Sequence, residues 1–171
     1  MKTISLKTYN SIGFAALAIL LALIFTISFS SCEKKDVATT TATLRTKEIT
    51  LTSTAGNTVS GKALIAENAD HSFNVNITLQ NTIKDTVMVM HIHNGSIATP
   101  GNIAIPLTNI TGTSGLATAA TLNITSGTSA SNTTVALTYD NIIAYAGYFN
   151  IHYSAAQINK VVANGNSVIN F

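Results

Sequence analysis

The sequence predicts an all-β fold: an antiparallel, Greek-key-like β-sandwich of eight or nine strands, preceded by an N-terminal signal or lipid-anchor segment. Three observations favour this class. Apolar and polar residues alternate along the chain after Ile49, whereas helical spacing is absent. The alternating segments are short and are separated by clusters of Gly, Asn, Ser and Thr. Only 9% of the 171 residues are charged, but Thr, Asn, Ser, Val and Ile replace the missing charge, so this composition does not indicate disorder.

Residues 1–31 are predicted to be a lipoprotein signal peptide. Lys2 and Lys7 precede the apolar run Ile12–Ile27. This run is shorter than a bilayer-spanning helix, which needs about 20 residues. A basic start followed by a short apolar run is the layout of an export signal. Cys32, the only cysteine, follows two serines and resembles the lipidated cysteine of the bacterial lipobox. We therefore expect an exported protein that is lipid-anchored through Cys32 to the bacterial cell envelope, on the outer membrane or the cell surface. An uncleaved membrane anchor with an incidental cysteine is the alternative.

Residues 32–48 are expected to form a flexible tether, because they are rich in charge and Thr and lack large apolar residues. The whole chain has a net charge of +2, which is too weak and too scattered for a nucleic-acid surface. A single cysteine also excludes an internal disulfide framework and a Cys-rich zinc site. The sequence therefore predicts a globular domain over residues 49–171 with no nucleic-acid partner.

The strands of this domain are predicted from alternation, in chain order. Ile49–Thr52 is the first, and Val59–Ala66 is expected to pair with Phe73–Leu79 as a hairpin, because turn-forming residues separate the two. In Phe73–Leu79 the apolar residues share one face. The later strands are Thr86–His93, Asn102–Leu107, Ala117–Thr125, Thr133–Tyr139, Tyr148–Tyr153 and Ser167–Phe171. Two short segments, Asp140–Ala146 and Ser154–Val162, favour helical turns.

The segment Val87–Met90 is apolar on both faces, which predicts a central strand that is covered on each side. Its two methionines are interpreted as core residues rather than as metal ligands. Asn94 and Gly95 tolerate positive φ and are expected to form the turn that ends this strand. Pro106 is expected to mark the exit of an edge strand.

Three of the four histidines lie on two predicted strands. His91 and His93 project to one face because side chains alternate along a strand, and His152 shares a face with Asn150. Neutral imidazoles bind copper or zinc, and three of them would leave one coordination position open. The lack of nearby carboxylates to orient the imidazoles favours the other interpretation, in which these histidines are structural and bond to backbone carbonyls and to nearby asparagines. His71, the fourth, is expected to be a surface turn residue.

Three motifs in order resemble the CHRD domain, which is named after chordin and occurs in many exported bacterial proteins. They are His91-Ile92-His93-Asn94-Gly95, the Gly-then-apolar segment Pro100–Leu107, and Tyr148-Phe149-Asn150-Ile151-His152. The resemblance covers about Thr58 to Phe171. It implies a β-sandwich-like domain in a secreted or surface protein and no established reaction. The chain departs from the family at Lys160–Gly165, which lacks the acid and the arginine of the usual Gly-Glu-Ile-Arg-Gly segment.

The H-x-H pair also resembles copper ligands of Cu/Zn superoxide dismutases, but the chain lacks the additional histidines and the disulfide cysteines of that family, so we do not expect dismutase activity. Nor does any nucleophile, base and acid set indicate a hydrolase. We therefore expect a lipid-anchored envelope or surface protein with a CHRD-like binding or interaction domain, without catalysis. Its partners would be the membrane, through the lipid, and an unidentified protein or glycan. The alternative is a copper- or zinc-binding protein that uses His91, His93 and His152.

Overall fold

The computed structural model describes residues 44–166 of the chain. The predicted signal peptide, Cys32 and the predicted strand Ser167–Phe171 lie outside the described residues. No helix in the range 44–166 has the length and the apolar character needed to cross a membrane.

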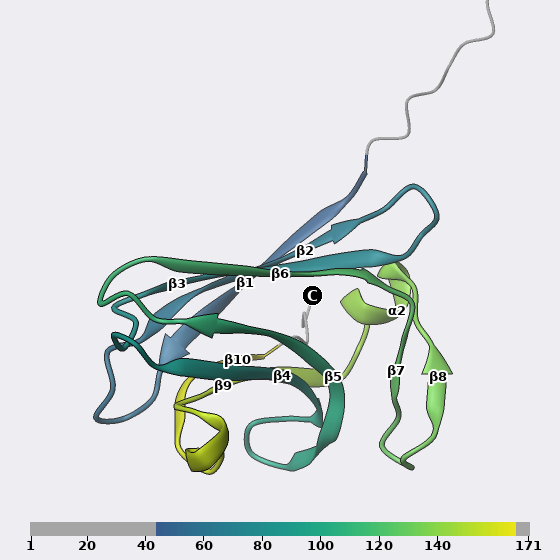
Figure 1. Cartoon of the computed structure of the whole chain (residues 1–171). Coiled ribbons are helices and arrows are strands. Elements are labelled where there is room, and N and C mark those ends of the chain that lie inside the picture. The colour runs from purple at the N-terminus through teal and green to yellow at the C-terminus, as the bar shows by residue number, and fades with distance from the viewer. Residues whose placement is uncertain (1–43, 167–171) are drawn as a thin grey trace, which may run out of the picture. The chain divides into compact units, whose positions relative to one another are not determined.

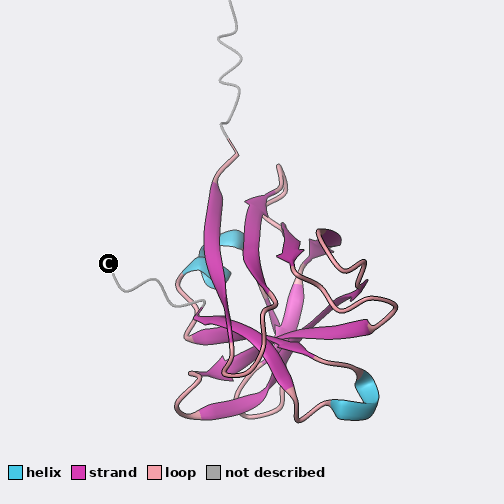
Figure 2. Cartoon of the chain, turned by 90° about the vertical axis from the view of Figure 1, so that its left-hand side faces the viewer, coloured by secondary structure: helices cyan, strands magenta, loops and turns pink. Residues whose placement is uncertain are grey.

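The described residues form ten strands and two short helical segments, which Figure 2 shows in magenta and cyan. The strands are β1 (Thr46–Ser53), β2 (Ser60–Glu67), β3 (Phe73–Gln80), β4 (Val87–Gly95), β5 (Pro100–Thr111), β6 (Ala117–Ile124), β7 (Ser126–Thr128), β8 (Thr134–Ala136), β9 (Gly147–His152) and β10 (Val161–Asn166). The helical segments are α2 (Tyr139–Ile143) and the 3₁₀ helix η1 (Ala155–Gln157).

Eight strands form one curled antiparallel sheet in the order β5-β4-β9-β10-β1-β2-β3-β6. Its two halves, β5-β4-β9-β10 and β1-β2-β3-β6, face each other as two layers (Figure 1). Strand β10 lies beside β1 in the order β10-β1-β2-β3, which is a Greek-key-like arrangement. The structure therefore confirms the predicted all-β sandwich.

The two layers are joined differently at their two sides. At one side β1 and β10 share two register pairs, Thr52 with Asn164 and Ser53 with Ala163. At the other side β5 and β6 are linked through threonine side chains: the Thr108 amide donates to Thr121 Oγ1 at 2.8 Å, and Thr121 Oγ1 donates to Thr108 Oγ1 at 3.2 Å. The sheet thus closes almost into a barrel. Its β5–β6 side is held by hydrogen bonds that involve threonine side chains instead of by backbone pairing of the two strands.

The hydrophobic core lies between the layers. From one layer β3 contributes alternate residues, Phe73, Val75, Ile77 and Leu79, all of them buried as the alternation predicts. From the facing layer β9 contributes Phe149 and Ile151, which are also fully buried. Burial of a large apolar side chain contributes roughly 1.5–3 kcal/mol each, so this interior fixes which face of every strand remains outside.

One end of the sandwich is covered by α2 and by the β7–β8 hairpin (Figure 1). Helix α2 begins after Thr138, whose side chain accepts from the Asn141 amide in a reciprocal capping box. Arg45 fastens this helix to the sheet: its guanidinium bonds Glu67 through two nitrogens at 2.7 Å and Asp140 at 2.7 Å.

Several element boundaries differ from the sequence prediction, and β10 was not predicted, since helical turns were expected up to Val162. Strand β1 begins at Thr46, within the predicted 32–48 tether, because Thr46–Glu48 pair with β2 and the preceding Arg45 is held by its ion pairs. Ser126–Thr128, which belongs to one of the Gly, Ser and Thr clusters expected to separate the strands, forms β7 by pairing with β8. Strand β8 in turn is shorter than predicted, because the cap at Thr138 starts a helix.

The environment of β4 and β5 also corrects two expectations. Met88 and Met90 are buried in the core as predicted, but Val87 is 48% exposed, so β4 is covered on one face only. Pro106 lies within β5, which continues to Thr111. A proline is tolerated there because β5 is at the end of the strand order and has a backbone-bonded neighbour on one side.

Candidate metal centre

Strands β4 and β9 bring the three predicted histidines together on the outer face of the sheet. The strands pair antiparallel, with His93 opposite Tyr148, His91 opposite Asn150, and Val89 opposite His152. Side chains that lie opposite each other in such a pair share one face. The predicted alternation is confirmed, because Ile92 and Ile151 point into the core while the three imidazoles gather on the other face.

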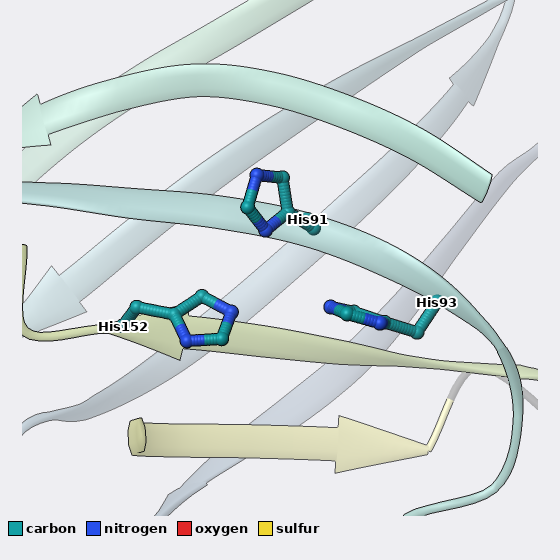
Figure 3. A group of neighbouring side chains, drawn as sticks. All are labelled: His91, His93 and His152. Carbon is teal, nitrogen blue, oxygen red and sulfur yellow. The ribbon is translucent and has the colours of Figure 1, made fainter. Parts of the chain in front are cut away.

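The three rings turn one nitrogen each toward a common space (Figure 3). One ligand atom from each of His91, His93 and His152 lies within 4.8 Å of the other two. Three such atoms are at most about 2.8 Å from a common point, and Zn–N bonds are about 2.0–2.1 Å long. Small side-chain movements would therefore place all three nitrogens at bonding distance from one metal ion.

Backbone carbonyls fix the orientation of two of these rings. His93 Nδ1 lies 3.1 Å from the Gly101 carbonyl oxygen, and His152 Nδ1 contacts the Ile158 carbonyl oxygen. A carbonyl oxygen only accepts, so each Nδ1 carries the proton and each Nε2 presents a lone pair. Metal-binding histidines commonly have such a partner on the nitrogen that does not bind the metal.

The nitrogens that face the common space have no hydrogen-bond partner. His91 Nδ1, His93 Nε2 and His152 Nε2 are all buried and unpaired. A buried polar atom without a partner costs free energy and is uncommon in native proteins. The carbonyl contacts of His93 and His152 engage their Nδ1 atoms and leave these three nitrogens unsatisfied.

The electrostatic environment favours the neutral form of His91 and His152. Burial, with a contribution from the neighbouring His152 and His93, lowers the pKa of His91 from 6.5 to about 4. Burial is also the main cause that lowers the pKa of His152. Both imidazoles are therefore uncharged at pH 7, which is the form that binds a metal ion.

Tyr148 and Asn150, the other residues of the predicted motif on β9, lie beside the cluster. The ring of Tyr148 stacks on His93 with a centroid separation of 5.1 Å and an interplanar angle of 20°. Tyr148 is itself buried and so limits the orientations open to the His93 ring. Asn150 is half-buried and lies opposite His91 in register.

Asn94 and Gly95 correct the sequence interpretation, because both belong to β4 and the turn follows at Ser96–Thr99. Asn94 points away from His93, since neighbours in a strand face opposite sides, and it is only 5% exposed. Its amide nitrogen donates to Asn102 Oδ1 at 2.8 Å and to the Thr128 carbonyl at 2.9 Å. Its amide oxygen accepts from the Tyr145 hydroxyl. Asn94 therefore joins β4, β5, β7 and the segment after α2, a role that the Asn-Gly turn signal concealed.

Other candidate residues remain outside the cluster. His71 lies in a surface turn as predicted, with φ +66° and a side chain that is 73% exposed and 3.1 Å from Glu67. Met88 and Met90 point into the core, so neither reaches the outer face.

Within residues 44–166, one group of three potential metal ligands is present, and its members lie close enough together to bind a metal ion. Comparisons of the chain with protein-family models, with curated protein sequences and with solved structures find no match.

Proposed function

We propose that this chain is a metal-binding protein in which His91, His93 and His152 hold one zinc or copper ion. The observation that carries the proposal is the convergence of three buried imidazole nitrogens that lack hydrogen-bond partners. Neutral imidazole is a ligand for both metals. A cation would bind all three nitrogens at once. Hydrogen bonds within the cluster cannot satisfy all three, because the protons of His93 and His152 are directed at carbonyls and a proton on His91 Nδ1 could serve only one of the two Nε2 lone pairs.

The sequence adds a proposed location and context. Export, lipidation of Cys32 and membership of the CHRD family would place the metal centre on a binding or interaction domain at the bacterial envelope. The support for these points is the N-terminal pattern and the three motifs. The geometry of the imidazoles favours metal binding over a purely structural role for the H-x-H motif.

The experiment measures metal binding by the full chain. Cys32→Ser is used in every sample so that the lone thiol cannot bind metal, and purification uses no histidine tag. We expect one zinc or copper ion per chain by calorimetric titration. At a free metal concentration of 100 times Kd, binding adds about 2.7 kcal/mol to the free energy of unfolding, which raises Tm by roughly 10 °C for a domain of this size.

Matched variants assign the site. His91→Ala with His93→Ala, and separately His152→Asn, should weaken metal binding by at least about 100-fold, since loss of even an outer partner of a ligand costs 10–100-fold. The control is His71→Asn, which keeps a residue that tolerates the positive φ and leaves the cluster intact. A chain that melts at the same temperature with and without metal would refute the proposal. So would an affinity loss in the control that equals the loss in the cluster variants.

A further inference from the structure

The surroundings of the histidine cluster carry no negative charge. Strands β4, β5 and β9 and the connection 153–160 contain no Asp or Glu, and Lys160 is their one Lys or Arg residue. Asp85 lies six residues before His91, roughly 20 Å along an extended strand, and Asp140 is already paired with Arg45 at 2.7 Å. A divalent ion held by three neutral imidazoles would therefore keep its full charge in a partly desolvated site, which is unfavourable unless an anion joins it.

The neighbouring surface on the β5 side is apolar. Ile103 lies opposite His93 and Pro106 lies opposite His91 in the β4–β5 register, so both share the face of the imidazoles. Ile103 is 40% exposed, and Pro106 is exposed as well. The cluster thus lies next to two exposed apolar side chains of β5, Ile103 and Pro106, which we name the β5 strip.

We propose that the metal ion takes a small organic monocarboxylate with an apolar tail as its fourth ligand. This inference rests on the proposed metal-binding function. The carboxylate oxygen would bind the ion and reduce its charge, while the tail would lie on the β5 strip and remove apolar surface from water. A phosphate fits less well, because those of its oxygens that face the β5 strip would lose water beside Ile103 and Pro106, whose side chains cannot donate hydrogen bonds.

The test uses the full Cys32→Ser chain loaded with Co(II), whose visible absorption changes when a ligand joins the metal. Acetate, butyrate, hexanoate and inorganic phosphate are titrated separately, and the metal-free chain is the blank. We expect all three carboxylates to change the spectrum. Affinity should rise by about twofold per added methylene if the tail is half-buried and by up to about fourfold if it is fully buried. Phosphate should bind more weakly than hexanoate.

Two variants separate the tail contact from the metal contact. Ile103→Thr keeps a β-branched residue in the strand but removes apolar surface, so it should reduce the hexanoate-to-acetate affinity ratio with Co(II) affinity unchanged. Leu122→Thr is the matched control, because Leu122 is 62% exposed on β6, in the other layer. It should leave both quantities unchanged.

The outcomes distinguish this inference from the function on which it rests. If Co(II) binds but carboxylates leave the spectrum unchanged, or if phosphate binds more tightly than hexanoate, the carboxylate inference is wrong and the metal site stands. If the increase in affinity from acetate to hexanoate persists in Ile103→Thr, the assignment of the carboxylate tail to the β5 strip is wrong. Failure of the chain to bind Co(II), zinc and copper overturns the proposed function, and the inference with it.

Discussion

Replacing Asn94 with aspartate should destabilise the domain in a pH-dependent way. The substitution keeps the shape of the side chain but removes the NH₂ group that donates to Asn102 Oδ1 and to the Thr128 carbonyl. At pH 7 a carboxylate would face two oxygens with almost no access to water, since this position is 5% exposed. An uncompensated buried charge of this kind costs about 3–5 kcal/mol. The hydroxyl of Tyr145 still donates to the new carboxylate, so we expect a value near the lower limit, about 3 kcal/mol.

The sign of the pH dependence follows from burial. Burial raises the folded-state pKa of the introduced carboxyl above its unfolded value of about 3.9. Below pH 3.9 the group is protonated in both states and can replace one of the two lost donors, so the cost falls to about 1 kcal/mol. The stability difference between the variant and the original chain should therefore grow as the pH rises above about 4.

Urea unfolding at pH 3.5 and pH 7 measures this difference, provided that the m-value is unchanged. Tyr145→Phe is the control: it removes one hydrogen bond to the same amide, and its cost, about 1 kcal/mol, should be independent of pH in this range. A cost for Asn94→Asp below about 1 kcal/mol at pH 7, or one that does not shrink in acid, would show that this amide does not hold the four segments together.

Three further predictions concern the ion pairs, the close strand approach and the helix cap. The Arg45 guanidinium lowers the pKa of Glu67 from 4.5 to about 2, so the stability lost in Glu67→Gln should be full above pH 4.5 and should disappear as the pH falls toward 2; urea unfolding across this range would contradict the argument if the difference were constant. Gly147→Ala should lower the free energy of unfolding by about 2 kcal/mol or more, because the new Cβ would lie 2.6 Å from a backbone oxygen of β4. The control is Gly115→Ala, whose Cβ would meet no atom closer than 3.9 Å. Equal melting temperatures of the two variants would refute the clash at Gly147. Thr138→Ala removes the α2 cap and should cost about 1 kcal/mol in the same unfolding assay, whereas Thr138→Ser should restore most of it.

The local features of the fold were predictable because they depend on alternation. The face of each residue in Phe73–Leu79 and in the β9 segment follows directly from the two-residue period of a strand, and so does the shared face of His91 and His93. Burial alternates accordingly in Phe73–Leu79, whereas in β9 the outward-facing Tyr148 and His152 are buried as well. The starts of the two short helical segments were also placed within one residue, since both interrupt the alternating pattern, but the segment predicted to end at Val162 extends into β10.

The features that depend on distant partners were not predictable. Nothing in the sequence near His152 specifies that β9 pairs with β4 rather than with a sequential neighbour, yet this pairing creates the histidine cluster. Two of the rings are oriented by the backbone carbonyls of Gly101 and Ile158. Every residue has such a carbonyl, so the residue types at these positions do not reveal the contact. Asn94 was misread because an Asn-Gly pair is a strong turn signal, whereas here only Gly95 adopts positive φ and the asparagine is needed for its amide.

The unequal attachment of the two layers has a consequence for motion. Six register pairs join β1 to β2, but only two join β1 to β10, and side chains alone link the opposite side. A movement of the two layers away from each other would therefore disrupt the β1–β10 pairing or the β5–β6 contacts first. The hydrogen bonds between strands within each layer would stay intact. Strands β4 and β9 are hydrogen-bonded neighbours within one layer. The three imidazole nitrogens would therefore move together with that layer, and the distances between them would stay the same when the two layers separate.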